Sequence, residues 1–281
     1  MVGNPASCEL VLRACGCEFA LSCADEETVA LIRSAFGGML IPPSTFAPAI
    51  RRYAIERGSP PSTFQVSDGI GSQSLEDADS LLFHIDKELT LTLQRQRRDL
   101  FFLHAAAVAW QGRAVALPAF SGTGKSTLTL VSLADGLEYL SDELAPIDLR
   151  ALTVYPYPHA LCLKSPPPLP HALPAGTLQH GGRFHVPLEA LPYVTRGEAL
   201  PLAAVIFLQR DEHRFDGLRP MTSASAVARL MAHALNPLAH PGCGMDAAVA
   251  LGRALACFEL DVRNLQAASG AIKSFLVGGE P

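Results

Sequence analysis

The sequence predicts an α/β protein, with a small α+β N-terminal domain over residues 1–80 and a larger α/β domain over residues 81–281. Three observations support this fold class. The 281 residues exceed the roughly 150 typical of one domain. Apolar residues make up 49% and charged residues 17%, which is enough apolar side chain to bury a core. Beyond residue 100, short apolar runs alternate with helical patterns, as in α/β proteins.

The first elements of the N-terminal region are short. The loose alternation over 10–21 predicts two strands around Gly16. A helix is expected over 25–36, because acidic residues open it and apolar residues recur at helical spacing. Gly37 and Gly38 end that helix.

The rest of this region predicts a strand, a loop and a helix. Residues 50–55 have strand character, and 58–73, rich in Gly, Pro and Ser, predict a loop. A helix is expected over 86–98, with Leu89 and Leu93 on one face.

The second region opens with two apolar strands and a helix. Strands are expected over 101–110 and 113–118, joined at Gln111-Gly112. A glycine-containing turn and a helix that ends at Asp135-Gly136 follow. The later elements are strands over 137–140, 144–155 (two) and 203–208, helices over 223–235 and 247–258, and an irregular proline-rich segment over 165–174.

Composition excludes several functional classes. The formal net charge of −5 and the single basic run, Arg95, Arg97 and Arg98, argue against general nucleic-acid binding. No apolar stretch approaches the roughly 20 residues of a membrane span. The first residues lack a basic start followed by an apolar run, so we expect a cytoplasmic protein with no membrane partner.

Seven cysteines in such a chain argue against a disulfide framework. Cys8, Cys15, Cys17 and Cys23 lie close together, but their C-x6-C-x-C-x5-C spacing matches zinc sites weakly. We therefore expect them to be small apolar residues in the strands of a little sheet.

The most specific feature is a phosphate-binding loop at residues 119–126, AFSGTGKS. It follows the G-x-x-x-x-G-K-[ST] pattern, with Ala119 in place of the first glycine, which is acceptable if Ala119 keeps a negative φ. In such loops backbone N–H groups surround phosphate oxygens, the lysine reaches the β- and γ-phosphates, and the serine hydroxyl ligates Mg²⁺. The predicted nucleotide-binding residues are Ser121, Gly122, Thr123, Gly124, Lys125, Ser126 and Thr127.

Two further features accompany the loop. Asp142 and Glu143 follow an apolar strand that we expect to be parallel to its neighbours, and active sites of α/β proteins gather at the carboxyl ends of such strands. One carboxylate is then available to hold Mg²⁺, and the other to accept a proton from an attacking hydroxyl. His104 precedes the hairpin that leads into the loop; periodicity alone leaves open whether it is a core residue or a functional one.

Together, LHAAAVAWQGRAVALPAFSGTGKST and YLSDELAPI resemble the catalytic domain of the HPr kinase/phosphorylase family. Fifteen residues separate His104 from Ala119, and seventeen separate Lys125 from Asp142, as in that family. The likeness is greatest to the HPr-kinase-related proteins of lasso-peptide biosynthesis, which phosphorylate a serine of a precursor peptide. It covers about residues 100–164, and more loosely the remaining C-terminal residues.

The resemblance implies a P-loop kinase domain like those of HPr kinase and phosphoenolpyruvate carboxykinase, with ATP and Mg²⁺ as cofactors. It makes Asp142 the general base, and it makes Glu143 a metal ligand together with Ser126 and Asp142. It further implies that His104 orients Asp142 and that Lys164 neutralises charge on the transferred group. The chain departs from the family at Ala119, at Glu143 and in the segment YPHALCLKSP, which replaces a glycine-rich signature.

Other residues give weaker signals. Arg183 and His185 could face the nucleotide or the acceptor, with a plain loop as the alternative. His213, His233 and His240 show no metal-ligand spacing. The proline-rich segment follows Lys164, a position from which it could border a peptide groove.

The sequence thus predicts an ATP- and Mg²⁺-dependent kinase that phosphorylates a serine hydroxyl of a precursor peptide. It leaves open whether the kinase is a monomer or a homo-oligomer. Alternatives are a small-molecule kinase on the same scaffold, a regulatory nucleotide-binding module and a carboxykinase-type metabolic enzyme. A retained pair of carboxylates disfavours the regulatory module. The short chain, with no obvious basic pocket for a dicarboxylic acid, disfavours the carboxykinase.

Overall fold

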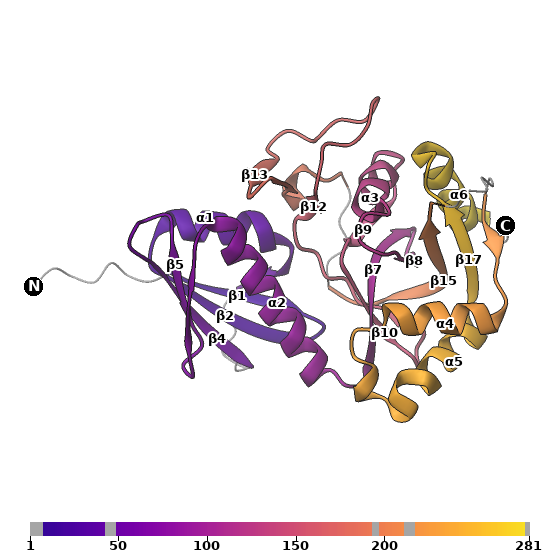
Figure 1. The fold of residues 1–281 in the computed structure, drawn as a ribbon, viewed down its shortest axis with the longest axis horizontal. Coiled ribbons are helices and arrows are strands. Elements are labelled where there is room, and N and C mark those ends of the chain that lie inside the picture. Colours follow the sequence, from indigo (N-terminus) through magenta and orange to yellow (C-terminus); the bar gives the residue numbers. More distant parts are fainter. Residues whose placement is uncertain (1–7, 43–48, 193–196, 211–216, 279–281) are drawn as a thin grey trace, which may run out of the picture.

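A computed structural model describes residues 8–42, 49–192, 197–210 and 217–278 of the chain. These residues form two domains that lie side by side along the long axis, with the N-terminus at one end and the C-terminus at the other (Figure 1). Each domain is built on its own β-sheet. We call residues up to Gln96 the N-terminal domain and residues from Leu100 onward the C-terminal domain.

The N-terminal domain is a six-stranded sheet in the order β3-β1-β2-β4-β5-β6. As predicted, two antiparallel strands flank Gly16. The strand predicted near residue 50 is also present and pairs in parallel with the second of them. The segment 58–73, expected to be a loop, contains strand β5 and most of a hairpin instead. The strands are β1 (Cys8–Ala14), β2 (Cys17–Cys23), β3 (Leu40–Ile41), β4 (Arg51–Arg57), β5 (Phe64–Ser67) and β6 (Ser72–Leu75).

Two helices cover this sheet. Helix α1 (Glu26–Phe36) begins where predicted, because the Asp25 side chain accepts a hydrogen bond from the Thr28 N–H. The short 3-10 turn η1 (Gly37–Met39) follows it. Helix α2 (Ala78–Gln96) begins eight residues before the expected start at residue 86, because Asp77 and Ser80 form a capping box.

The predicted domain boundary at residue 80 falls inside helix α2. The buried face of this helix packs into the core of the N-terminal sheet, through Leu81, Ile85, Leu89 and Leu93. Helix α2 therefore belongs to the N-terminal domain along its whole length.

The C-terminal domain contains an eight-stranded sheet in the order β11-β10-β7-β8-β15-β17-β16, with β9 paired to β7 outside this path. Strands β8, β15 and β17 are mutually parallel. The bounds are β7 (Leu100–Trp110), β8 (Arg113–Pro118), β9 (Glu138–Ser141), β10 (Leu144–Asp148), β11 (Thr153–Val154), β15 (Leu200–Gln209), β16 (Arg219–Pro220) and β17 (Ala256–Asp261).

Four helices cover the two faces of this sheet (Figure 1). On one face lie α3 (Lys125–Ala134) and α6 (Leu265–Gly278), which pack against each other. On the other lie α4 (Ser223–His233) and α5 (Met245–Ala254), joined through the 3-10 turns η3 (Pro237–Ala239) and η4 (Pro241–Gly244). The helix expected over 247–258 ends at Ala254, because the apolar residues that follow form the buried strand β17 beside β15.

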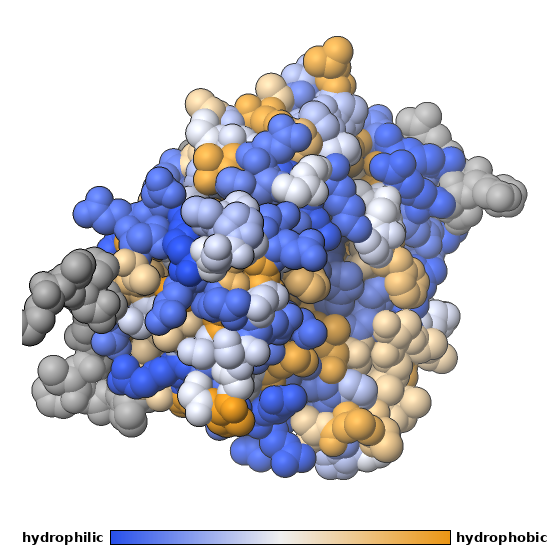
Figure 2. Space-filling view, turned by 60° about the vertical axis from the view of Figure 1, so that its left-hand side comes forward, coloured by the Kyte–Doolittle hydropathy of each residue, from blue (hydrophilic) through white to orange (hydrophobic). Residues whose placement is uncertain are grey.

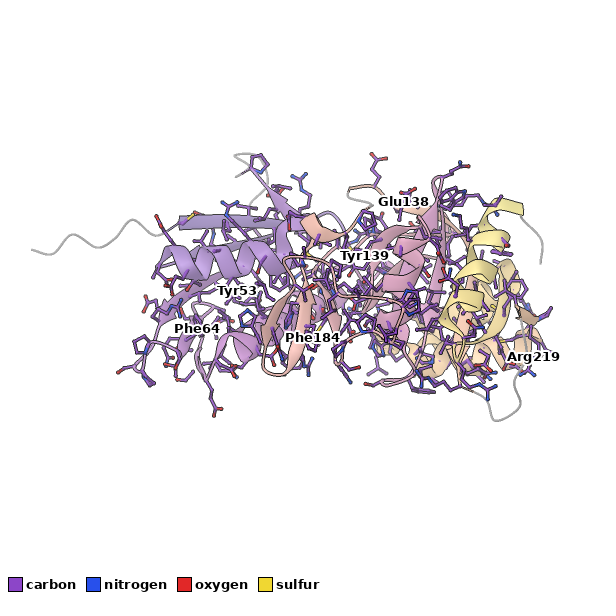
Figure 3. The ribbon with its side chains drawn as sticks, turned by 90° about the horizontal axis from the view of Figure 1, so that it is seen from above. Tyr53, Phe64, Glu138, Tyr139, Phe184 and Arg219 are labelled. Carbon is purple, nitrogen blue, oxygen red and sulfur yellow. The ribbon has the colours of Figure 1, made fainter. Side chains whose placement is uncertain are left out.

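A three-stranded sheet, in the order β12-β14-β13, lies beside the junction of the two domains (Figure 1). It consists of β12 (Leu161–Leu163), β13 (Leu178–His180) and β14 (Arg183–Val186), and the turn η2 (Leu188–Ala190) follows. The proline-rich segment 165–174 between β12 and β13 contains no helix or strand, as predicted. In Figure 3, Phe184 of β14 lies near the middle of the long axis, between Phe64 of the N-terminal domain and Arg219 of the C-terminal domain.

The clustered cysteines Cys8, Cys15, Cys17 and Cys23 lie in the β1–β2 hairpin as free thiols, and the last three are buried. Across the described residues no group of three or more His, Cys, Asp or Glu side chains is arranged to hold a metal ion. Within the same part of the chain, no helix combines the length and apolarity that a membrane crossing requires. On the face drawn in Figure 2, hydrophilic side chains predominate and apolar ones form small groups.

Candidate active site

The topology of strands β7, β8 and β9 gathers the predicted site residues. Strands β8 and β9 pair antiparallel with opposite edges of β7, so their carboxyl ends point the same way. Pro118 at the end of β8 pairs with Ala105, and Ser141 at the end of β9 pairs with Ala107. The phosphate-binding loop and the Asp142-Glu143 pair therefore begin on either side of His104. The expected parallel strand is antiparallel to its neighbour β7, but its carboxyl end still reaches the site.

The phosphate-binding loop has the backbone that its sequence requires. Gly122 and Gly124 have φ values of 88° and 111°, which residues with a side chain rarely adopt. Ala119 is buried and is absent from the positive-φ positions, so this alanine fits where the pattern has glycine. Helix α3 starts at Lys125, which directs its N-terminal N–H groups and positive dipole end toward the loop.

Lys125 and His104 are in direct contact. The Lys125 side chain is largely buried, and its Nζ lies 2.8 Å from Nε2 of His104. Burial lowers the pKa of Lys125, while the carboxylates of Glu143 and Asp142 counteract that shift. The contact with His104 thus holds the lysine inside the site.

Glu143 is the carboxylate that faces the pocket. Its side chain is 53% exposed, and Oε1 lies 3.1 Å from Nε2 of His104. Burial would raise the pKa of Glu143, but the His104 hydrogen bond and the Lys125 charge outweigh it and lower this pKa to about 2. A single ring nitrogen faces both neighbours, so His104 cannot accept from Lys125 and donate to Glu143 at once.

Asp142 occupies a different place from the one expected. It is 1% exposed, and its Oδ1 accepts a hydrogen bond of 3.0 Å from the Tyr139 hydroxyl. Its Oδ2 accepts one of 3.2 Å from the Cys162 N–H. The expectation that His104 orients Asp142 is corrected: His104 contacts Glu143. Both carboxylates lie in the bend between β9 and β10, which places the Asp142 side chain in the interior and the Glu143 side chain at the pocket.

Two cations contact the phosphate-binding loop from other elements. Lys164, after β12, donates a 2.6 Å hydrogen bond to the Ser121 hydroxyl. Arg210, after β15, donates a 2.9 Å hydrogen bond to the Thr123 carbonyl. Lys164 was a predicted site residue, whereas sequence reasoning missed Arg210. Arg210 lies at the carboxyl end of a buried strand parallel to β8, and this position could have indicated a role in the site.

A pocket of about 480 Å³ contains these groups. Its C-terminal-domain wall includes the loop, His104, Glu143, Lys164, Arg183 and Arg210. The opposite wall comes from the N-terminal domain, whose helix α2 contributes Asp79, Leu82, Phe83 and Asp86 at the spacing of one helical face. No motif indicates that this domain lines the site, because the two walls meet only through the packing of the two domains.

The remaining histidines have different surroundings. His185 lines the pocket with Nε2 3.4 Å from Asp79 Oδ1, and burial lowers its pKa. His233 is buried, and its ring centroid lies 4.6 Å from that of Phe120. His240 Nε2 lies 3.1 Å from the Leu100 carbonyl oxygen. His213 falls outside the described residues.

The pocket residues suit a phosphate-bound magnesium ion. Mg²⁺ usually takes one or two protein oxygens and completes its shell with water and substrate phosphates. Ser126 and the ionised Glu143 both line the pocket and offer that small oxygen set.

Comparison with solved structures gives a weak likeness. No protein-family model matches the chain, and no curated protein matches it. Among solved structures, it is similar to the HPr(Ser) kinase/phosphatase from Coxiella burnetii, with 14% sequence identity and a TM-score of 0.34. That match covers 63% of this chain and 94% of the other. A likeness this weak assigns no activity to the chain.

Proposed function

We propose that this protein transfers the γ-phosphoryl group of ATP to a hydroxyl group, with a serine of a small precursor peptide as the acceptor. The observation that carries the proposal is the convergence of Lys125, His104 and Glu143 beside a phosphate-binding loop. A loop that only bound nucleotide would need neither a buried histidine contact to its lysine nor an ionised carboxylate in the same pocket.

The cations of the pocket provide the larger part of catalysis in this proposal. Phosphoryl transfer passes through a transition state with charge spread over the transferred oxygens, so positioned cations and N–H groups stabilise it. Lys125 reaches the phosphates from the start of α3. Lys164 and Arg210 contact opposite parts of the loop, at Ser121 and Thr123. All three line the pocket.

Ser126 and Glu143 would hold the magnesium ion. When bound, Mg²⁺ neutralises charge on the β- and γ-phosphates. Movement of Lys125 onto a phosphate would free Nε2 of His104 to donate to Glu143. His104 would then fix the orientation of the Glu143 carboxylate.

The acceptor hydroxyl would approach Glu143 rather than Asp142. Glu143 faces the pocket, whereas Asp142 is buried with both oxygens hydrogen-bonded. The low pKa of Glu143 makes it a weak base, which suits a transition state that needs a positioned hydroxyl more than a strong base. Asp142, held by its own hydrogen bonds, would fix the backbone position of the neighbouring Glu143.

A peptide acceptor is supported by the wall opposite the phosphate-binding loop. Helix α2 presents two carboxylates and the exposed ring of Phe83 there, and Ser165 at the start of the proline-rich segment borders the same pocket. Such a mixed polar and apolar wall offers contacts for a side chain and backbone next to the reacting serine. The sequence resemblance to peptide kinases favours the same acceptor class.

Mass spectrometry of serine-containing precursor peptides, incubated with the protein, ATP and Mg²⁺, tests the proposal. We expect a gain of one phosphate, about 80 Da, on a serine, and no gain with Lys125→Ala. Phosphorylation of a small alcohol with no reaction on any peptide would support the small-molecule kinase instead. ATP binding without transfer to either class would contradict the kinase proposal and favour a regulatory module.

A further inference from the structure

The segment that joins β11 to β12 runs between the two domains. On the C-terminal side, the Tyr157 N–H donates a 3.0 Å hydrogen bond to the Leu140 carbonyl of β9. On the N-terminal side, the Ala160 N–H donates a 2.6 Å hydrogen bond to the Ala35 carbonyl of α1. A Cβ atom on Gly38 would lie 2.5 Å from the Pro158 carbonyl oxygen, so glycine permits this close approach.

A row of polar side chains crosses the same junction. On α2, Asp86 Oδ1 accepts a 2.8 Å hydrogen bond from the hydroxyl of the fully buried Tyr157. The Tyr157 ring packs edge-on against His159, with their centroids 5.4 Å apart. His159 Nε2 lies 3.3 Å from Asp142 Oδ1, and the row ends at Glu143 in the pocket.

His159 lies at the centre of this row. Its side chain is 12% exposed, and its Nε2 forms an ion-pair contact with Asp142 without a well-aligned hydrogen bond. Its carbonyl oxygen lies 3.0 Å from the Tyr139 hydroxyl, whose single proton is shared between this carbonyl and Asp142 Oδ1. His159 therefore contacts Asp142 directly through its ring and indirectly, by way of Tyr139, through its carbonyl.

Electrostatics supports the same arrangement. The His159 ring lies against the Asp142 carboxylate, which is only 1% exposed. The described residues place no Lys or Arg within ion-pair distance of Asp142. A buried carboxylate without a partner is costly, so His159 is the group that stabilises Asp142 in this position.

We propose that His159 is a positioning residue of the phosphoryl-transfer site, which holds Asp142 and thereby the backbone of Glu143, and that its contact with Tyr157 makes this position depend on helix α2. This inference rests on the proposed function. Asp142 also holds the Cys162 N–H of β12, the strand that leads to Lys164. Displacement of Asp142 would therefore move Glu143 and Lys164 together.

The test compares His159→Phe and His159→Gln with the wild-type protein. Phenylalanine fills the space but removes the contact to Asp142, whereas glutamine keeps a donor. We expect His159→Phe to lower kcat for transfer by about tenfold or more. The reason is that small displacements of Glu143 and Lys164 misalign their charges with the transition state. ATP affinity should change by less than about threefold, and His159→Gln should recover part of the lost kcat. His84→Gln, a half-buried histidine of α2 outside the pocket, is the matched control.

A second measurement does not depend on activity. Hydrogen exchange of the Cys162 amide reports its bond to Asp142, and we expect His159→Phe to accelerate this exchange more than His84→Gln does. Tyr157→Phe removes only the hydroxyl that reaches Asp86. If His159→Phe fails to fold, Tyr157→Phe replaces it in the test. We expect Tyr157→Phe to change kcat and the Cys162 amide exchange in the same directions, but by less.

The outcomes separate the two proposals. Unchanged kcat and unchanged Cys162 exchange in a folded His159→Phe protein would overturn the positioning role. An equal loss of kcat and ATP affinity, with no recovery in His159→Gln, would also overturn it, because that pattern indicates general disruption. If the wild-type protein transfers no phosphate but His159→Phe still accelerates the Cys162 exchange, the contact between His159 and Asp142 is supported and the kinase proposal is overturned.

Discussion

Nζ of Lys125 lies 2.8 Å from Nε2 of His104, so the lysine of the phosphate-binding loop contacts a residue of the neighbouring strand β7. Glu143 approaches the same nitrogen. A nucleotide phosphate that attracts Lys125 would leave His104 free to donate to Glu143. Nucleotide binding and the orientation of Glu143 are thereby connected through one imidazole.

Lys125→Ala should abolish phosphoryl transfer. The substitution removes the cation nearest the transferred group, and losses of this kind are on the order of 10³-fold. The initial rate of phosphate incorporation measures the effect. Lys87→Ala, on α2 and outside the pocket, is the control for loss of a lysine. Transfer by Lys125→Ala at a rate close to wild type would exclude the loop as the phosphate site.

Glu143→Gln and Asp142→Asn should separate activity from stability. Glu143 is half exposed, so its amide variant should fold normally and lose transfer. Asp142 is buried and accepts two hydrogen bonds, so its amide variant presents an N–H₂ group where an acceptor is needed. That mismatch should cost about 1–3 kcal/mol in the free energy of unfolding. Denaturant titration and transfer rates measure the two effects. A stable but inactive Asp142→Asn, beside an active Glu143→Gln, would return the base role to Asp142.

Lys164→Met should lower the transfer rate more than the affinity for ATP. The ammonium group lies beside the loop at Ser121, where it can neutralise charge that develops on the transferred group. We expect a loss of about 10²-fold in kcat. Ser121→Ala removes the contact but keeps the charge, so it should retain most of the activity. Equal losses of kcat in Lys164→Met and Ser121→Ala would show that the hydrogen bond between the two side chains, and not the lysine charge, supports transfer.

His233 should make stability depend on pH. Burial, together with the smaller effect of the charges of His104, Lys125 and Arg229, lowers its pKa from 6.5 to about 4. Between these two pKa values the unfolded chain binds a proton that the folded protein does not. The contribution of His233 to stability is therefore full above pH 6.5 and falls as the pH drops toward 4.

Urea unfolding of wild type and His233→Phe at several pH values measures this dependence. The difference between their unfolding free energies should change by at most about 1.4 kcal/mol per pH unit in that window and level off outside it. A constant difference from pH 7 to pH 4 would show that His233 titrates normally.

Local patterns in the sequence were enough to predict many elements. The helix after Asp25, the β7–β8 hairpin and the phosphate-binding loop depend on neighbours along the chain, through a cap, a turn and glycines with positive φ. The errors have local causes as well. The capping box at Asp77 and Ser80 extends α2, and residues 256–258 join a strand because β15 offers them a partner.

The sequence by itself determined which chemical groups the site contains, because loop, carboxylates and histidine follow short motifs with fixed spacing. Only the tertiary structure decided which carboxylate is exposed, and it turned Glu143 to the pocket and buried Asp142 against His159. It also brought Arg210 and the face of α2 to the site, from elements far apart along the chain. Such contacts depend on how sheets and helices pack in three dimensions. The spacing of residues along the chain does not predict that packing.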